Sequence, residues 1–242
     1  MDISCTEVWG GTGASDVSVQ LAGVRGECYS RPFDSGARGG DIHFLSVCGV
    51  SMLSKIVLAD VSGHGEATAD VSSIIHAALV KNINANDNSI MLEQVNRAFL
   101  EHRTDDFKFT TMVSLIIDNR DRSLVYAYAG HPAILLGEAA TGRFRRIEPE
   151  TGPRGGIPLG VLADTQYAQH FVQLEQGDVL VVYTDAFTEV RTPDGGFLGE
   201  EGLAQLLESA NTMRPDELKE HVLSAVGDKL DDDASLIVLE VL

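Results

Sequence analysis

The hydrophobic pattern changes its period along the chain, and each change predicts a different kind of element. Nearly continuous apolar runs over residues 41–50 and 54–61 predict two strands that a short turn joins. A stripe at helical spacing follows from Val71 to Ile83 and predicts a helix. Ser89 is then expected to cap a second helix, whose apolar positions are Leu92, Val95 and Phe99.

From residue 110 onward the pattern is mainly that of strands. Runs 110–119 and 123–131 flank a polar turn and predict a hairpin. Further strands are expected in residues 133–139, 143–149, 171–186 (two strands) and 234–242. Two late helices are predicted, one near Glu200–Ser209 and one opened by Pro215. Because strands occur in pairs and helices in groups, the pattern favours an α+β sandwich over a parallel sheet.

The composition narrows the class of protein. The 242 residues include 36 acidic and 18 basic side chains, a formal charge of −18, which argues against a nucleic-acid partner or an anionic membrane. No apolar run approaches the roughly 20 residues that span a bilayer, and the opening MDISCTEVWGG lacks a secretion signal. Three cysteines without CxxC spacing (Cys5, Cys28 and Cys48) are typical of reduced thiols. We therefore expect a cytoplasmic protein with a single domain, residues 1–242.

A glycine-rich stretch, WGGTGASD, lies near the start of the chain. It has the composition of a phosphate-binding loop, but it lacks a preceding strand and the GxGxxG or Walker spacing. A flexible N-terminal loop is therefore the prediction for this stretch.

Aspartates stand at the ends of the apolar strands: Asp41, Asp60, Asp185 and Asp232. If these strand ends meet at one edge of a sandwich, the carboxylates repel each other unless a cation lies between them. Oxygen ligands without a Cys/His cluster favour Mg²⁺ or Mn²⁺, and two such ions can activate a water against a phosphoryl group. The alternative for any one of them is a turn or cap residue, and the run 231–233 alone is typical of a solvated turn.

A set of motifs supports the first interpretation by resemblance. In chain order they are GGD (39–41), ADVSGHG (59–65), FTTMVSL (109–115), AGHPAILL (129–136), PLGV (158–161), LEQGDVLVVYTDAFTE (174–189) and DDASLIVLEV (232–241). This ordered set resembles the SpoIIE/RsbU-like serine phosphatases, a bacterial branch of the PPM (type 2C) metal-dependent phosphatases. The resemblance covers residues 39–242 and leaves 1–38 as an uncovered N-terminal segment.

The resemblance implies a fold and a set of metal ligands. The fold is a four-layer αββα sandwich, with two mostly antiparallel sheets flanked by helix pairs. Asp60 resembles the carboxylate that bridges two Mn²⁺ or Mg²⁺ ions, and the Val61 main-chain carbonyl is a further ligand. The other implied ligands are Asp41 (directly or through a metal-bound water), Asp185 and Asp232. Asp233 takes a supporting polar place, and Asp231 is the alternative if the motif is offset by one residue.

Several further residues have two interpretations. His64 is a candidate general acid for the departing serine oxygen or a residue that only packs its turn. Arg38 and Arg31 precede the GGD turn, and either is a candidate for the substrate phosphate or a solvated surface residue. His131 is expected to fix its loop by hydrogen bonding, and His43 has no assigned role.

The chain departs from the family pattern at two places. Ile42-His43-Phe44 follow GGD, where the family often has aromatic residues and another Asp, and Ala186 stands where glycine is commoner. Neither change removes a bridging ligand, so we expect an active enzyme.

The function implied is that of a metal-dependent protein-serine/threonine phosphatase. Its substrate would be a phosphorylated partner protein, by resemblance a STAS-domain anti-sigma-factor antagonist, and a homodimer formed through the helices is a further expectation. The first alternative is a non-catalytic pseudophosphatase that docks a phosphorylated partner. The second is an acidic Ca²⁺-binding domain, but the sequence lacks a D-x-D-x-D-G loop.

Overall fold

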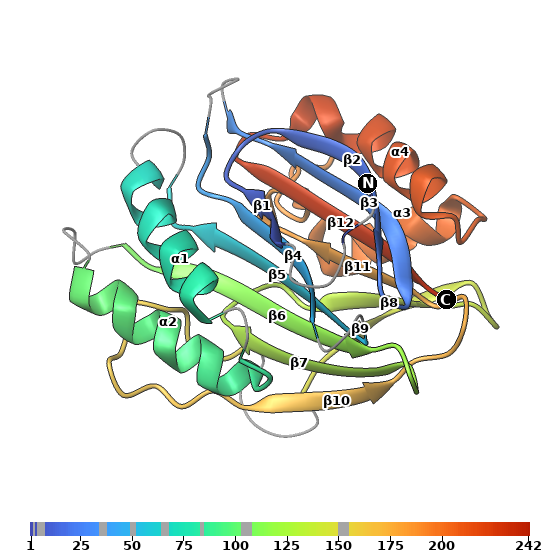
Figure 1. Cartoon of the computed structure of the whole chain (residues 1–242). Helices are drawn as coiled ribbons and strands as arrows, with labels where there is room; N and C mark the ends of the chain where they lie inside the picture. The colour runs from blue at the N-terminus through green and yellow to red at the C-terminus, as the bar shows by residue number, and fades with distance from the viewer. Residues whose placement is uncertain are drawn as a thin grey trace.

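The fold consists of two six-stranded sheets and two pairs of helices (Figure 1). The computed structural model describes residues 1, 3, 8–33, 38–48, 52–63, 68–82, 85–102, 108–149 and 155–242. The strands are β1 (Val8–Gly11), β2 (Ser15–Leu21), β3 (Val24–Arg31), β4 (Ile42–Cys48), β5 (Leu53–Val61), β6 (Thr110–Asp118), β7 (Ser123–Ala129), β8 (Ile134–Glu138), β9 (Arg143–Ile147), β10 (Gln169–Gln173), β11 (Val179–Tyr183) and β12 (Ala234–Val241). The helices are α1 (Ala69–Asn82), α2 (Asn88–His102), α3 (Gly199–Ser209) and α4 (Pro215–Val226), with short 3₁₀ turns η3 (Asp185–Phe187) and η4 (Gly227–Lys229).

Every paired strand runs antiparallel to its neighbour. One sheet has the order β1-β4-β5-β6-β7-β10 and the other β2-β3-β12-β11-β8-β9. Hairpins such as β4–β5 and β6–β7 supply sequential neighbours, whereas β12 returns from the end of the chain to lie between β3 and β11. The N-terminal and C-terminal parts of the chain therefore share one sheet.

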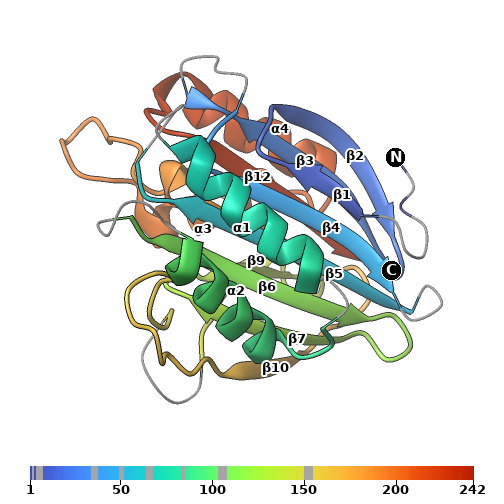
Figure 2. The same ribbon diagram turned by 60° about the vertical axis from the view of Figure 1, so that its left-hand side comes forward.

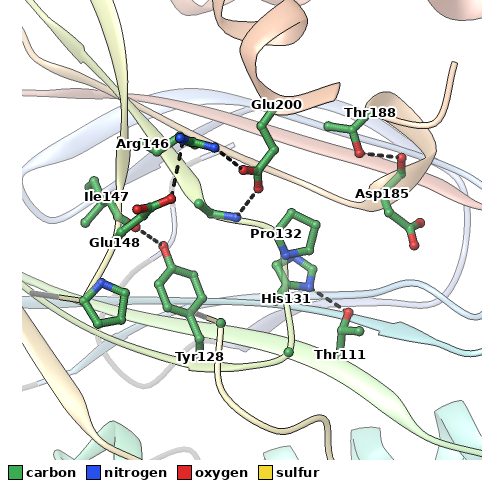
Figure 3. Close-up of a pocket in the computed structure, with 14 residues that line it drawn as sticks. Thr111, Tyr128, His131, Pro132, Arg146, Ile147, Glu148, Asp185, Thr188 and Glu200 are labelled. Atoms are coloured by element: carbon green, nitrogen blue, oxygen red, sulfur yellow. Dashed lines mark hydrogen bonds and ion pairs between the residues drawn. The ribbon is translucent and has the colours of Figure 1, made fainter. Parts of the chain in front are cut away.

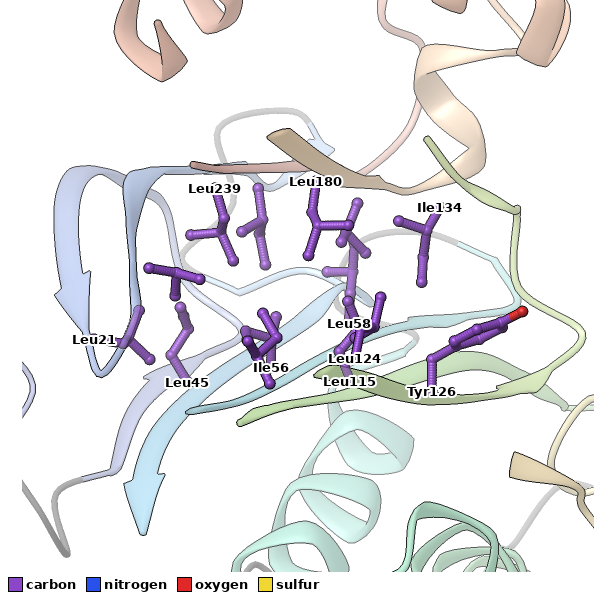
Figure 4. Close-up of a cluster of buried hydrophobic side chains, with 14 of the residues drawn as sticks. Leu21, Leu45, Ile56, Leu58, Leu115, Leu124, Tyr126, Ile134, Leu180 and Leu239 are labelled. Atoms are coloured by element: carbon purple, nitrogen blue, oxygen red, sulfur yellow. The ribbon is translucent and has the colours of Figure 1, made fainter. Parts of the chain in front are cut away.

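The two sheets pack face to face around an apolar core. Its buried side chains include Leu45, Ile56, Leu58 and Leu115 from one sheet and Leu180 and Leu239 from the other, as Figure 4 shows. Burying each of these side chains contributes roughly 1.5–3 kcal/mol of hydrophobic free energy. This middle layer fixes how the ends of the two sheets lie relative to each other.

Each sheet is covered on its outer face by one helix pair. The apolar faces of α1 and α2 pack on β4–β7, and those of α3 and α4 pack on β8, β11 and β12 (Figures 1 and 2). The layer order is therefore helices, sheet, sheet, helices. The predicted four-layer αββα sandwich is confirmed.

The N-terminal segment differs from the prediction. Val8–Gly11 within the glycine-rich stretch form β1, which pairs with β4, so the prediction of a flexible loop was wrong there. Gly10 allows this pairing because a Cβ atom at its position would lie 2.1 Å from the His43 carbonyl oxygen. β2 and β3 follow and belong to the second sheet, so the segment 1–38 contributes strands to the sandwich.

The cap of α2 also differs from the prediction. Asp87, not Ser89, caps the helix: its Oδ1 accepts hydrogen bonds from the backbone N–H groups of Ser89 (2.9 Å) and Ile90 (3.2 Å). Pro215 lies in the first turn of α4 as expected. Ile83, the last position of the predicted stripe on α1, lies outside the described residues.

Candidate active site

The strand register brings the predicted aspartates to one end of the sandwich. Ile42 pairs with Ala59, so Asp41 before β4 and Asp60 at the end of β5 lie side by side. In the other sheet, Tyr183 pairs with Leu236, so the residues after β11 and those before β12 also share one end. Each sheet therefore contributes one pair of acidic strand ends.

Asp41 is buried, and only one of its two carboxylate oxygens has a hydrogen bond in the part of the chain that the structure describes. Its side chain is 2% exposed, and its Oδ2 accepts a hydrogen bond from the Thr184 hydroxyl at 3.0 Å. That hydroxyl accepts in turn from the Ser235 N–H at 3.0 Å, which links β4 to the β11 and β12 ends. Within the described residues, Asp41 Oδ1 is buried without a hydrogen-bond partner. Burial, together with the negative charge of Asp233, raises the pKa of Asp41 well above its usual range.

Asp60 and Asp185 experience the same electrostatic repulsion. Burial raises the pKa of Asp60 well above its usual value, and the negative charges that raise it further are those of Asp41, Asp185, Asp232 and Asp233. Burial likewise raises the pKa of Asp185 to about 6, with Glu189 and Asp232 as the next causes. Carboxylates that raise one another's pKa in this way gain stability from a shared cation.

Asp233 has a different environment, in which the backbone uses both of its oxygens. Oδ1 accepts from the Phe33 N–H and Oδ2 from the Gly40 N–H, both at 2.6 Å. A Cβ on Gly39 would lie 2.5 Å from Asp233 Oδ1, so the close approach of the GGD turn requires glycine there. Asp232 Oδ1 accepts from the Asp233 N–H at 2.8 Å. Asp233 therefore anchors the turn that carries Asp41.

The donor set fits hard divalent cations. A buried carboxylate oxygen without a partner lies among carboxylates with raised pKa values, and oxygen donors suit Mg²⁺ and Mn²⁺. The Val61 carbonyl oxygen faces the same turn, because a Cβ on Gly40 would lie 3.0 Å from it. Within the described residues, however, no three His, Cys, Asp or Glu side chains already enclose a position for an ion.

The remaining predicted residues lie elsewhere or outside the described part of the chain. His64 falls in residues 64–67, which the structure does not describe. Arg38 is exposed and lines a cavity with the backbone of Gly10–Gly13 and with Ser73 and His76. None of the predicted acidic ligands lines that cavity.

A cavity of about 360 Å³ opens beside Asp185. Figure 3 shows Arg146 and Glu148 on one side of it, Asp185 and Thr188 on the other, and His131 between them. His131 is buried, and its Nδ1 lies 2.9 Å from the Thr111 hydroxyl, so it makes the expected hydrogen bond. Burial lowers the pKa of His131 to about 3, which keeps the imidazole neutral near pH 7.

Sequence reasoning missed an ion-pair network that shapes this cavity. Glu200 on α3 accepts from the Ala133 N–H at 2.9 Å and from Arg146 Nη1 at 3.2 Å, and Arg146 Nε lies 3.5 Å from Glu148 Oε1 (Figure 3). Tyr128 donates its hydroxyl to the Ile147 carbonyl at 2.8 Å. The partners lie on different elements, so no sequence spacing connects them. The one signal in the sequence is the run RFRR, which places three arginines in one short segment.

Comparison with known sequences gives consistent matches. The family model described as Stage II sporulation protein E (SpoIIE) matches residues 54–242. Phosphoserine phosphatase RsbU of Bacillus subtilis (strain 168) is 30% identical over 190 residues, which are 76% of this chain and 55% of RsbU. Protein IcfG of Synechocystis is 27% identical over 136 residues, 54% of this chain and 20% of IcfG. The chain thus spans about half, or less, of the length of these curated relatives.

Solved structures share the fold. The RsbU and RsbW domains of Rv1364c from Mycobacterium tuberculosis match with a TM-score of 0.78 and 26% identity over 95% of this chain and 62% of that one. The PP2C phosphatase domain of SpoIIE from Bacillus subtilis matches with a TM-score of 0.72 at 18% identity, covering 98% of this chain and 64% of that one. The catalytic domain of the phosphatase PstP, in complex with two manganese ions, has a TM-score of 0.62 at 16% identity and covers 90% and 98%.

Proposed function

The chain belongs to the Stage II sporulation protein E (SpoIIE) family, and on this premise we propose that it is a metal-dependent protein-serine/threonine phosphatase. The observation that carries the proposal is the acidic end of the sandwich. The support is that Asp41, Asp60, Asp185 and Asp232 lie at strand ends on one side of the sandwich, that their charges raise the pKa of Asp60, and that within the described residues Asp41 Oδ1 is buried without a hydrogen-bond partner. Such an arrangement is costly unless cations bind it.

The chain's own residues have separable tasks in this proposal. Asp41, Asp60, Asp185, Asp232 and the Val61 carbonyl would hold two Mn²⁺ or Mg²⁺ ions. Two such ions, when bound, supply a low-pKa water as nucleophile and positive charge for the phosphoryl oxygens.

Two further groups prepare the acidic end for its ligands. Asp233 holds the GGD turn through the Phe33 and Gly40 N–H groups, so that Asp41 is in place before a ligand binds. Thr184 donates to Asp41 Oδ2 and so directs the other oxygen, Oδ1, away from the hydrogen-bond network. His131 stays neutral beside the cavity and adds no charge of its own.

The proposed substrate is phosphoserine or phosphothreonine on a partner protein. The support is the name of RsbU, a phosphoserine phosphatase at 30% identity, and the motif order of the family. By the same resemblance we propose a STAS-domain anti-sigma-factor antagonist as the partner, and the cytoplasm as the compartment. Cys28 and Cys48 are free thiols, in accord with a reducing compartment. None of the helices in the described residues is long and apolar enough to cross a membrane.

Turnover by the purified chain tests the proposal. We would measure hydrolysis of p-nitrophenyl phosphate and of a phosphoserine peptide with Mn²⁺, with Ca²⁺ and with chelator, beside Asp60→Asn. Turnover that requires Mn²⁺ and is lost in Asp60→Asn is the expected result. A folded chain that binds a phosphopeptide but shows no turnover with either metal would favour the pseudophosphatase docking module instead.

A further inference from the structure

A second depression lies next to the cavity beside Asp185, at the edge of the sandwich. This second depression, of about 630 Å³, lies between β9 and β10 and shares Arg146, Ile147 and Glu148 with the first. Because the two depressions share this stretch of β9, they are neighbours: the first reaches Asp185 and the second reaches Phe171 on β10. We call the second depression, lined by Arg145, Arg146, Glu148, His170, Phe171 and Val172, the β9–β10 groove.

Both strands beside this groove are edge strands. In the described part of the chain, β9 pairs only with β8 and β10 only with β7, and Figure 1 shows β10 at the outer edge of its sheet. An unpaired strand edge presents main-chain donors and acceptors to an added extended segment. Five residues of such a segment would extend about 17 Å along either strand.

An apolar side chain stands open on this edge. Phe171 is 62% exposed, although its neighbours His170 and Val172 are half-buried. The His170 ring lies 5.5 Å from the Tyr126 ring, so this part of the groove wall is aromatic. An exposed aromatic residue on an edge strand favours association and is a suitable anchor for a partner's apolar side chain.

The β9–β10 groove is also less acidic than the chain as a whole. Among the described residues that line it, Arg145 and Arg146 face one carboxylate, Glu148, in a protein of net charge −18. Arg145 pairs with Glu138 and Arg146 with Glu148 and Glu200, but the two arginine side chains remain 51% and 39% exposed. Exposed ion pairs contribute little free energy, so acidic side chains of a partner can exchange for the internal ones.

We infer that the β9–β10 groove binds the extended polypeptide flank of the phosphorylated residue in the substrate protein. The flank places an apolar side chain on Phe171 and an acidic one along β9. Because the neighbouring cavity shares β9 residues with the groove and reaches Asp185, a segment bound in the groove would place its phosphorylated residue on the side of Asp185. This inference rests on the proposed function. It assigns substrate specificity to the residues of β9 and β10.

Peptides of opposite flank charge test the inference. One phosphoserine peptide would carry Leu and Glu on both sides of the phosphoserine, the other Ser and Lys, with p-nitrophenyl phosphate as a probe that does not reach the groove. Phe171→Ala and Arg145→Glu are each expected to lower kcat/KM for the acidic peptide by about fivefold to tenfold and to leave p-nitrophenyl phosphate unchanged. Val80→Ala, at a 46% exposed position on α1, should change neither.

Three results would overturn the inference. They are equal kcat/KM for both peptides in the wild-type chain, an equal loss for p-nitrophenyl phosphate, or a dimer that Phe171→Ala abolishes, which would assign the groove to a second copy.

Binding separates this inference from the proposed function. Fluorescence anisotropy of the labelled acidic peptide on Asp60→Asn needs no turnover. If Asp60→Asn binds the peptide, adding Phe171→Ala weakens that binding, and the wild-type chain with Mn²⁺ shows no phosphatase activity, the groove is retained and the phosphatase is rejected. Phosphatase activity of the wild-type chain without such binding would retain the phosphatase and reject the groove.

Discussion

At the residue scale, the acidic end of the sandwich trades stability for ligand binding. Asp41 is buried, its Oδ2 accepts a hydrogen bond from Thr184, and its Oδ1 has no partner in the part of the chain that the structure describes. A folding core gains nothing from such a group, because an uncompensated buried carboxylate costs free energy. The cost is explained if the oxygen is reserved for a cation.

Asp41→Asn should therefore separate stability from activity. The amide oxygen can still accept from Thr184, and the negative charge is gone, so we expect the metal-free variant to be more stable by about 1–3 kcal/mol. Phosphatase activity should fall by more than about 100-fold, because a ligand matters more than its supporting contacts. Urea unfolding in chelator and kcat/KM with Mn²⁺ measure the two effects. Asp164→Asn, at an exposed aspartate between β9 and β10, is the control and should change neither.

His131 makes stability depend on pH in a defined direction. Burial lowers its pKa to about 3 from 6.5, so between these values the unfolded chain binds a proton that the folded chain does not. The stability that His131 contributes is therefore lost as the pH falls below 6.5. Between pH 7.5 and 5, the wild-type chain should lose up to about 2 kcal/mol more stability than His131→Asn. The carboxylates titrate in both proteins, so parallel pH profiles would contradict this assignment.

At the element scale, the sequence pattern predicts those strands and helices whose apolar positions are buried. It misses the elements that form only because another segment lies beside them in the fold. β5 and β6 are long, mostly apolar strands, β11 is a short apolar one, and α1 and α2 carry apolar stripes, so these patterns are visible in one sequence. β1 has four residues, two of them glycine, and forms because β4 lies beside it. The Asp87 cap likewise depends on which residue the turn before α2 brings to the free N–H groups.

The positions of the acidic residues at the strand ends also follow from the apolar pattern. A carboxylate directly after or before an apolar strand must lie at a sheet end, and antiparallel register makes these ends coincide. The Glu200–Arg146–Glu148 network was not predicted, because α3, β9 and the loop before β8 meet only in the folded chain.

Gly10 tests the pairing of β1 with β4. Gly10→Ala would place a Cβ 2.1 Å from the His43 carbonyl oxygen, so we expect a loss of more than about 1 kcal/mol in the free energy of unfolding. Gly11 is the matched control, because its φ of 158° is close to the 143° of Gly10 while no atom lies within 4 Å of its Cβ position. Equal effects of the two substitutions in urea would mean that the close approach of β1 to β4 does not matter.

At the scale of the whole molecule, the two sheets pack through an apolar layer, and both contribute acidic residues at one end of the sandwich. The apolar middle layer sets the spacing of the sheets, and the family match over residues 54–242 agrees with the resemblance that the ordered motifs indicate. A net charge of −18 lets this surface attract divalent cations and repel a phosphoryl group until they bind. The β9–β10 groove, with its exposed Phe171 and arginines, lies at the edge of the same two sheets.

Anomalous diffraction from crystals of the chain grown with Mn²⁺ tests directly whether the acidic end holds two ions. We expect two anomalous peaks between the carboxylates of Asp41, Asp60, Asp185 and Asp232, both weakened or lost in Asp60→Asn. A map with no peak among these four side chains, from a chain that hydrolyses p-nitrophenyl phosphate, would rule out the two-ion site.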